Sequence, residues 1–181
     1  SLVKVADDIF ALAYTGYSND GYIRTFKVDA SGNIAAKNSI EHNKNYGIYN
    51  ALTHLTGTTY VLAYTGVSNK GKMSTFTIPA NGASITNVKT INMDASRSQW
   101  NAIHKMTDST VVVVYEGSGP KFLMKTFQIS SDGKTITEKK SETIFEGKAN
   151  WNAITQVDAN TYVIATQGKD DDGYLYTYDV A

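Results

Sequence analysis

Short apolar stretches alternate with polar turn sequences along the whole chain, and the alternation repeats. One unit begins at Trp100-Asn101-Ala102-Ile103, continues with the apolar run from Val111 to Gly117, and then reaches the segment from Met124 to Ile129. The same order of residues precedes it, from Tyr49 to Ile78, and follows it, from Trp151 to Val180. A further version opens the chain, so the sequence consists of four repeats.

Three columns of identical residues measure the period. The first two columns advance in steps of 50, 51 and 51 residues, and the third advances in steps of 50 and 51. The columns are Gly16, Gly66, Gly117 and Gly168; Thr25, Thr75, Thr126 and Thr177; and Gly32, Gly82 and Gly133. A period of about 40 to 50 residues built only of short strands is the sequence signature of a β-propeller blade.

Each repeat predicts four strands. The first starts at the Asn-Ala-Ile position, as in 51–55, and the second is the most apolar, as in 111–115, which is typical of a strand covered on both faces. The third, as in 23–28, alternates between its two faces. The fourth, as in 135–144, carries the charges that suit an outermost strand. We expect the aromatic residues of the second and third strands in the core, namely Tyr14, Tyr64, Tyr115, Phe26, Phe76, Phe127 and Tyr178.

The hairpin loops and the chain ends complete the predicted architecture. Loops rich in Asn, Asp and Gly, such as 17–21, predict hairpins between the second and third strands. The last repeat stops after its third strand. We therefore predict an all-β, propeller-type array of about four antiparallel four-stranded blades with a three-stranded last blade, forming one domain over 1–181. The predicted blades are 1–49, 50–100, 101–151 and 152–181.

The sequence leaves three explanations for how such an array covers its end faces. It forms a small four-bladed ring, it is a part of a longer array, or it is half of a ring that a second copy completes. An uncapped repeat array must cover its exposed end faces. We favour self-association or a longer parent.

Composition excludes several classes of function. Lys plus Arg equals Asp plus Glu at 17 each, so nothing in the net charge favours nucleic acid as a partner. No apolar run reaches about 18 residues, so we expect no membrane insertion. The absence of cysteine excludes disulfides and thiol chemistry. This composition is compatible with a secreted or cell-surface location.

The order of strands and loops within each repeat resembles that of a known kind of β-propeller repeat. In that kind, an apolar strand like Tyr-Val-Leu-Ala-Tyr (60–64) is followed by Gly, a Ser-Asn-x-Gly loop (68–71) and a Thr-Phe-x-Ile strand (75–78). Uncharacterised repeat proteins of archaeal and bacterial cell surfaces are similar. The resemblance implies the propeller fold and a role as a binding scaffold or lectin. The turn at 131–135 also resembles a sialidase Asp-box but lacks its final aromatic residue, which argues against a sialidase.

One column combines an aromatic residue with asparagine at the start of the first strand. It contains Tyr49, Asn50, Trp100, Asn101, Trp151 and Asn152. An aromatic face beside an amide suits a sugar, because ring C–H groups stack on it while hydroxyls bond to the amide. Repetition would add avidity. The alternative is structural: the ring wedges adjacent blades together while the asparagine bonds to backbone groups of the turn.

Candidate catalytic and metal-binding residues are sparse. His42, His54 and His104 occupy three different columns, so a shared site would require chance convergence. The sequence has no Gly-x-Ser-x-Gly elbow and no glycine-rich phosphate loop, and we expect no cofactor. The cluster Asp170, Asp171 and Asp172 is a weak calcium candidate, since Asp also suits a hairpin tip.

These observations predict a non-catalytic module that mediates protein or surface contacts. Its expected partner is a second copy of itself, a longer parent array or another protein. A multivalent lectin that uses the Tyr/Trp-Asn column, with a glycan as its partner, is the alternative. A glycosidase-like enzyme is the weaker alternative, because repeated blades offer no single asymmetric acid–base pair.

Overall fold

The computed structural model describes residues 1–180, which form fifteen strands and three short 3₁₀ turns in four antiparallel sheets. The first sheet contains β1 (Leu2–Lys4), β2 (Ile9–Thr15), β3 (Gly21–Val28) and β4 (Ile34–Asn43). The second contains β5 (Ile48–Thr56), β6 (Thr59–Thr65), β7 (Gly71–Thr77) and β8 (Thr86–Asp94). The third contains β9 (Gln99–Thr107), β10 (Thr110–Gly117), β11 (Lys121–Ile129) and β12 (Ile136–Glu146), and the fourth contains β13 (Asn150–Gln156), β14 (Thr161–Gln167) and β15 (Gly173–Asp179). The 3₁₀ turns are Tyr17–Asn19, Val67–Asn69 and Lys169–Asp171.

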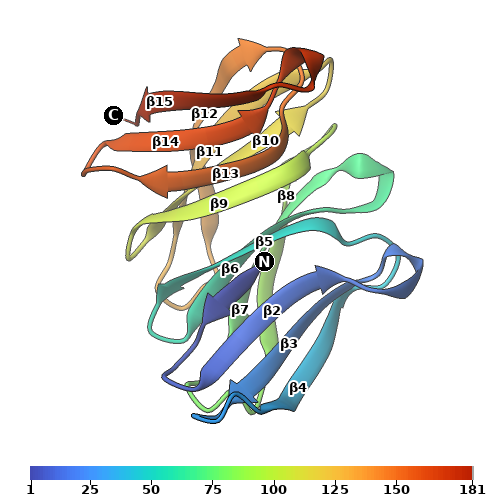
Figure 1. The fold of residues 1–181 in the computed structure, drawn as a ribbon, viewed down its shortest axis with the longest axis vertical. Coiled ribbons are helices and arrows are strands. Elements are labelled where there is room, and N and C mark those ends of the chain that lie inside the picture. Colours follow the sequence, from blue (N-terminus) through green and yellow to red (C-terminus); the bar gives the residue numbers. More distant parts are fainter. Residues whose placement is uncertain (181) are drawn as a thin grey trace.

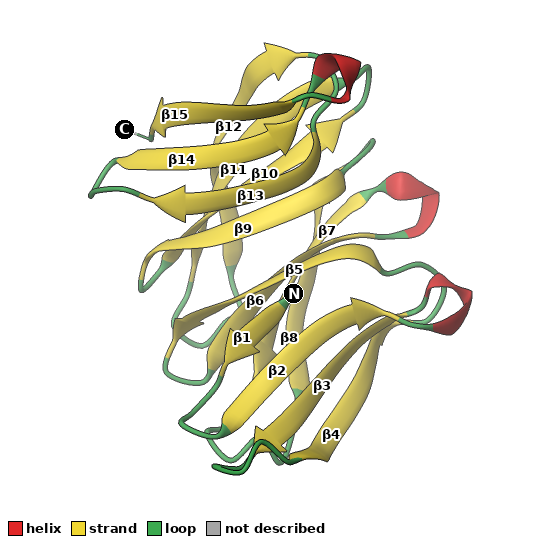
Figure 2. Ribbon diagram, viewed as in Figure 1, coloured by secondary structure: helices red, strands yellow, loops and turns green. Residues whose placement is uncertain are grey.

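The sheets confirm the predicted all-β architecture, including the three-stranded last unit (Figure 2). Within each sheet the strands pair in chain order, so every connection is a simple hairpin. The polar fourth strands β4, β8 and β12 are the outer edges, as predicted. The innermost strands begin slightly before the predicted blade boundaries, at residues 48, 99 and 150.

The four sheets follow one another in chain order, with the first and last at opposite ends of the long axis (Figure 1). The innermost strands lie side by side in the order β1, β5, β9, β13. Because the first and last sheets lie at opposite ends, residues 1–180 form an open array. A closed four-bladed ring, one of the three arrangements open at the sequence level, is therefore not formed.

Three apolar clusters join successive sheets. The first shows a rule of size, in which large side chains of the later sheet pack onto shorter side chains of the earlier one. In the first joint, Tyr60, Tyr64 and Phe76 cover Ala11 and Ala13. Small residues on one face let the sheets approach closely enough for the large ones to be fully desolvated, and a buried aromatic contributes about 2 to 3 kcal/mol by area. The equivalent positions fill the second and third joints.

The repeated threonine and glycine columns also link the sheets. The Thr25 hydroxyl donates to the Gly82 carbonyl of the second sheet at 2.7 Å, and Thr75 donates to the Gly133 carbonyl of the third sheet, also at 2.7 Å. Gly82 and Gly133 have φ of 63° and 72°, the left-handed conformation that favours glycine. The columns that reveal the period in the sequence are therefore contacts between repeats.

The Ser-Asn hairpin loops hold the chain as it passes to the next sheet. Ser18 and Asn19 have φ of 56° and 67°, as both central residues of a type I′ turn do. The Asn19 carbonyl accepts the N–H of Gly47 at 2.7 Å, and the Asn69 carbonyl accepts that of Ser98 at 2.9 Å. The loop thus fixes the position from which the next innermost strand starts. No 3₁₀ turn within residues 1–180 exceeds three residues, far short of the length of a membrane-spanning helix.

The predicted core aromatics differ according to their sheet. Tyr64, Tyr115, Phe76 and Phe127 are at most 2% exposed, which confirms the prediction for the two inner sheets. Tyr14, Phe26 and Tyr178, in the first and last sheets, are only partly buried. The first sheet has no neighbour on the face that carries Phe26, and Tyr178 lies on the edge strand β15.

Candidate functional site

A β-bulge places the aromatic–asparagine pair at the start of each innermost strand. In the second sheet, Ile48 pairs with Thr65 but Ala51 pairs with Ala63, so three steps on β5 face two on β6. Similar shifts occur in the third and fourth sheets. The extra residue bends the strand and redirects its side chain. The aromatic residue and the asparagine beside it therefore depart from the regular alternation of side chains between the two faces of the sheet.

The aromatic residue of each bulge has a left-handed backbone. Tyr49, Trp100 and Trp151 have φ of 51°, 55° and 52°. This conformation costs a bulky residue on the order of 1 kcal/mol or more, because its Cβ approaches the following carbonyl. Three independent instances show that the surrounding fold imposes the same geometry in every repeat.

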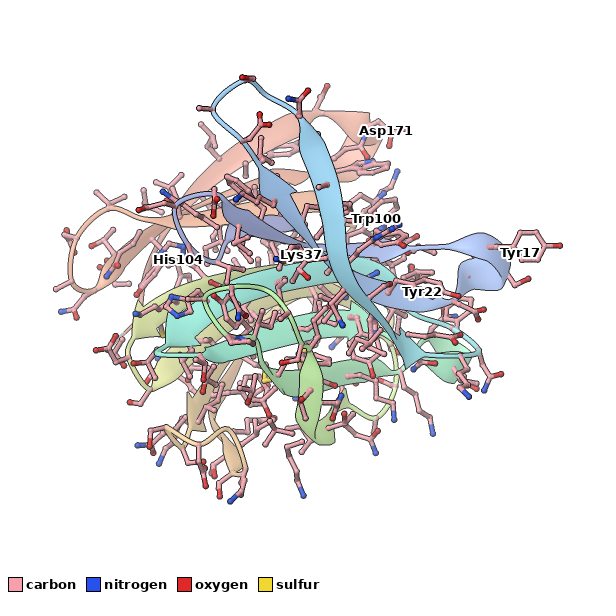
Figure 3. The ribbon with its side chains drawn as sticks, turned by 90° about the horizontal axis from the view of Figure 1, so that it is seen from below. Tyr17, Tyr22, Lys37, Trp100, His104 and Asp171 are labelled. Atoms are coloured by element: carbon pink, nitrogen blue, oxygen red, sulfur yellow. The ribbon has the colours of Figure 1, made fainter. Side chains whose placement is uncertain are left out.

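The three rings form a continuous row, here called the aromatic ladder (Tyr49, Trp100 and Trp151). The ring centroids are 4.3 Å apart between Tyr49 and Trp100 and 4.0 Å apart between Trp100 and Trp151, with the rings tilted by 46° and 47°. Trp100 belongs to the innermost strand β9 and lies within the body of the molecule, whereas Tyr17 projects outward at a hairpin tip (Figure 3). Trp151, the last ring, is 67% exposed and presents one free aromatic face.

The asparagine beside each ring bonds to the backbone. Asn152 Nδ2 donates to the Trp100 carbonyl at 2.8 Å and to the Ala149 carbonyl at 3.0 Å. Asn101 Nδ2 donates to the Tyr49 carbonyl at 3.1 Å. Asn50 Nδ2 donates to the Gly47 carbonyl at 2.9 Å. Each asparagine thus stabilises its own turn, and two of them also hold the preceding bulge.

The asparagine oxygens point inward as well. Asn101 Oδ1 accepts the Ser98 hydroxyl, while Asn50 Oδ1 and Asn152 Oδ1 are buried without a hydrogen-bond partner. The rings and asparagines together line a hollow of about 180 Å³, here called the ladder hollow. Because the amides face the protein, the aromatic faces are the part of the column that meets solvent.

A buried ion pair next to the ladder was not found by sequence reasoning. Glu116 is 3% exposed, and its Oε1 accepts a hydrogen bond from Arg97 Nη2 at 2.5 Å while its Oε2 accepts the Ala149 N–H at 2.9 Å. In the same column, Thr15 and Thr65 instead donate to the carbonyls of Gly47 and Ser98. The column reads Thr15, Thr65, Glu116 and Gln167, and the one charged residue in it is the sequence signal that would have revealed the pair.

Burial and nearby charged side chains change the pKa of Tyr49, the first residue of the ladder. Burial raises the pKa of the Tyr49 hydroxyl above its ordinary value, followed by the effect of Tyr46 and, more weakly, of the Glu116 carboxylate, whereas Arg97 opposes the shift. Tyr49 is therefore a neutral hydrogen-bond donor at physiological pH. The aromatic ladder thus consists of two tryptophans and one tyrosine, and the charge of Arg97 acts on the tyrosine.

The three histidines do not come together. His42 lies at the joint of the first two sheets, against Tyr64 at a ring-centroid distance of 4.7 Å. His54 bonds to the Gly57 carbonyl at 2.9 Å, and His104 lies against Tyr162. Burial lowers the pKa of His42 to about 4, an effect that the Asn50 side chain partly opposes, and burial also lowers the pKa of His104.

The acidic loop forms a hairpin tip. Asp170 and Asp171 have φ of 61° and 63°, and the Asp171 carboxylate pairs with Lys148. Within residues 1–180, no three His, Cys, Asp or Glu side chains are arranged to hold a metal ion. The Asp-box-like turn has a similar local role, since Asp132 accepts hydrogen bonds from the Ser130 hydroxyl at 2.6 Å and from the Lys134 N–H at 3.0 Å.

This chain was compared with known protein families, curated proteins and solved structures. The sequence matches no protein-family profile and no curated protein. Solved structures do match. NanB sialidase from Streptococcus pneumoniae, as its K499G mutant, is similar over 99% of this chain with a TM-score of 0.70 and 15% sequence identity. The chain has a β-propeller-type fold.

Other similar structures have unrelated roles. A proposed 6-phosphogluconolactonase from Bacteroides fragilis matches 96% of the chain with a TM-score of 0.63 and 13% identity. Chaetomium thermophilum Sqt1, solved bound to the N-terminus of ribosomal protein L10, matches 98% with a TM-score of 0.58 and 16% identity. The chain spans 29%, 48% and 43% of these three proteins, so it corresponds to less than half of each. Likeness at this level of identity establishes the propeller fold and its four blades only.

Proposed function

We propose that this chain is a non-catalytic β-propeller module that binds another protein or a surface through its aromatic ladder, in a secreted or cell-surface setting. The observation that carries the proposal is Trp151, whose ring is 67% exposed at the end of a row held by strained backbone in all three bulges. Backbone strain that the fold imposes repeatedly motivates a functional hypothesis for the residue that bears it.

The composition of the ladder suits a protein partner. Tryptophan and tyrosine are among the residue types that contribute most to protein–protein binding energy, and the ladder consists of two tryptophans and one tyrosine. The ladder hollow, at about 180 Å³, is smaller than the roughly 300 to 1,000 Å³ of small-molecule sites. A protruding side chain or loop of a partner fits such a hollow better than an enclosed small ligand does.

The non-catalytic character is supported by the state of the nearest acid. Glu116, the buried acid among the described residues, has one oxygen bonded to Arg97 and the other to the Ala149 N–H. A carboxylate held in this way has no free position from which to transfer a proton to a substrate. This arrangement disfavours the glycosidase-like alternative.

The lectin alternative rests on the exposed aromatic faces alone. Sugar recognition would need amides that are free to bond to hydroxyls, whereas the three asparagine amides bond to the backbone of the protein or are buried. The lectin alternative therefore requires stacking on Trp151 with hydrogen bonds from other groups.

The two candidates separate in one pair of measurements on wild type and Trp151→Ala. Peptides selected from a random displayed library on the wild-type chain should include a class that binds at least about tenfold more weakly to Trp151→Ala. The same peptides should keep their affinity for Tyr17→Ala, because Tyr17 is an even more exposed aromatic that lies at a hairpin tip outside the ladder. If every selected peptide binds all three proteins equally, the ladder is not a protein-contact site.

A glycan array probed with the same proteins tests the alternative. Binding to a glycan that disappears in Trp151→Ala and persists in Tyr17→Ala would replace the protein-contact proposal with the lectin. Both variants should fold, since the two rings are 67% and 92% exposed and their removal takes little from the core.

A further inference from the structure

The two end sheets carry the unmatched halves of one repeated joint, and we infer that two copies of this chain join head to tail through them into an eight-sheet ring. The partner is a second copy of the chain. The inference concerns the outer faces of the first and fourth sheets, and Leu2 and Leu175, which are not part of the aromatic ladder, carry it.

The internal joints define what an end face requires. In each joint, one residue of the third strand of the earlier sheet shares a cluster with one residue of the innermost strand of the later sheet. The pairs are Ile23 with Leu52, Met73 with Ile103, and Met124 with Ile154. Ile23, Met73 and Met124 are at most 1% exposed. The next member of the first column is Leu175, and the preceding member of the second column is Leu2.

Both of these residues are open to solvent in a single chain. Leu175 is 76% exposed on the outer face of the fourth sheet, and Leu2 is 62% exposed on the outer face of the first. Leu175 continues a column that is buried in the other three sheets, and Leu2 belongs to a column whose other members are buried or partly buried, so the two exposed leucines indicate an interface that a single chain leaves unfilled. Leu175 of one copy and Leu2 of the next would continue the series of pairs.

The face around Leu2 is shaped as the receiving half. Leu2, Phe10, Leu12, Phe26, Val28 and Ile34 line an open hollow of about 440 Å³ with apolar side chains only. Phe10, Leu12 and Phe26 are in the columns of Tyr60, Leu62 and Phe76, which bury the face of the preceding sheet in the first joint. The large side chains that cover a preceding sheet are thus present on the first sheet with no sheet to cover.

The fourth sheet presents the matching small residues. Val163 and Ala165 of β14 occupy the columns of Val61 and Ala63, which the third sheet buries completely in the second joint. In the fourth sheet both residues are partly exposed. The rule of large side chains on short ones therefore holds between the fourth sheet of one copy and the first sheet of another.

A polar contact sets the register of the proposed joint. The Thr25–Gly82 and Thr75–Gly133 bonds would be continued by Thr177 of one copy and Gly32 of the other. Gly32 already has φ of 84°, close to the 63° and 72° of its counterparts. A Cβ at Gly82 or Gly133 would meet the preceding sheet, whereas one at Gly32 would meet nothing within 4 Å. The space beside Gly32 is where the neighbouring sheet would lie.

Symmetry decides the number of copies. A head-to-tail joint is heterologous, so it either closes into a ring or grows into a filament. Propellers close with about 4 to 8 blades, and two chains of four sheets supply eight. Two copies would then satisfy both end faces of each chain, with no apolar face left open.

The mass of the chain in solution tests the inference. Light scattering should give twice the chain mass of 19.7 kDa at micromolar concentration. Leu175→Asp and Leu2→Asp should each be monomeric, because either change places a charge in both joints of the ring. Both leucines are mostly exposed in a single chain, so the variants should retain the wild-type far-UV circular dichroism. Tyr17→Asp, at a hairpin tip away from both faces, should remain dimeric.

Mixing the two monomeric variants identifies the type of interface. The intact Leu2 face of the Leu175→Asp chain can still meet the intact Leu175 face of the Leu2→Asp chain, so the mixture should recover a dimer with one joint. A joint between two identical faces would not be rescued in this way. A monomeric wild type at 100 µM, a mass of three or more copies, dimers in either single variant, or a mixture that stays monomeric would overturn the inference. A monomeric wild type would mean that other sheets of a longer protein cover these faces.

Discussion

Removing the Glu116 carboxylate should destabilise the third and fourth blades more than any surface charge change would. Glu116 accepts hydrogen bonds from Arg97 and from the N–H of Ala149, the residue that leads into β13. It is 3% exposed, and Ala149 is fully buried. A Glu116→Ala change therefore leaves a buried donor and a partly buried cation without their acceptor.

The expected magnitude follows from these two losses. An unsatisfied buried N–H costs about 1 to 3 kcal/mol. The Arg97 side chain is 35% exposed, so the cost of removing its partner lies between that of breaking a buried ion pair, about 3 to 5 kcal/mol, and that of breaking an exposed one, below about 1 kcal/mol. We take a cost of about 1 to 2 kcal/mol for this pair. Glu116→Ala should thus lower the free energy of unfolding by about 2 to 5 kcal/mol. Glu116→Gln keeps an acceptor for Ala149 and should lower it by only about 1 to 2 kcal/mol.

Urea unfolding followed by far-UV circular dichroism measures both changes. Glu146→Ala is the matched control in the same blade, because its pair with Lys121 at 3.0 Å is exposed and should contribute below about 1 kcal/mol. Hydrogen exchange adds a local readout, since the Ala149 amide should exchange faster in Glu116→Ala and keep its protection in Glu116→Gln. A Glu116→Ala change within 0.5 kcal/mol of the control, or equal losses for both Glu116 variants, would refute this account.

Two further predictions concern the joint between the first and second blades. Burial lowers the pKa of His42 from 6.5 to about 4 in the folded chain, so between these two pH values the unfolded chain binds more protons than the folded one. The free energy of unfolding should therefore be at its full value above about pH 6.5 and fall by up to about 3 kcal/mol as the pH drops to 4. Urea midpoints measured over this pH range would show the loss. His42→Leu should flatten this pH dependence, and an unchanged slope would assign it to other groups. Gly47→Ala should lower the free energy of unfolding by about 2 to 4 kcal/mol in the same assay, since the new Cβ would lie 2.5 Å from the Gly21 Cα. Gly173→Ala is the control and should be nearly neutral, because a Cβ at Gly173 meets open space. Equal losses of stability in the two variants would contradict the close approach of Gly47 to Gly21.

The proposed assembly and the proposed binding surface fail independently. Trp151→Ala should remain dimeric while it loses ladder-dependent binding, and Leu175→Asp should become monomeric while it keeps the ladder of each chain. The two activities are expected to separate because Trp151 lies at the start of β13 and Leu175 on the edge strand β15.

Much of the fold was determined by local pattern. The apolar second strands, the polar fourth strands and the Asn- and Gly-rich loops predict four-stranded units, because alternation and turn chemistry act over a few residues. The Thr25, Thr75 and Gly82, Gly133 columns revealed the period, since the first and second joints place the same hydrogen bond at the same two positions. Repetition makes long-range contacts visible in a single sequence.

What only the tertiary structure decided lies between repeats and depends on where bulges and sheet ends fall. The sequence showed an aromatic beside an asparagine, but only the folded chain shows that Asn152 bonds to a carbonyl 52 residues away and that the rings stack as a ladder. The Arg97–Glu116 pair occurs in one joint only, so its column marks Glu116 as an exception but does not name Arg97 as its partner. The exposed Leu2 and Leu175 belong to columns that are buried or partly buried elsewhere, and the same pattern becomes an open face only where the array has no neighbouring sheet.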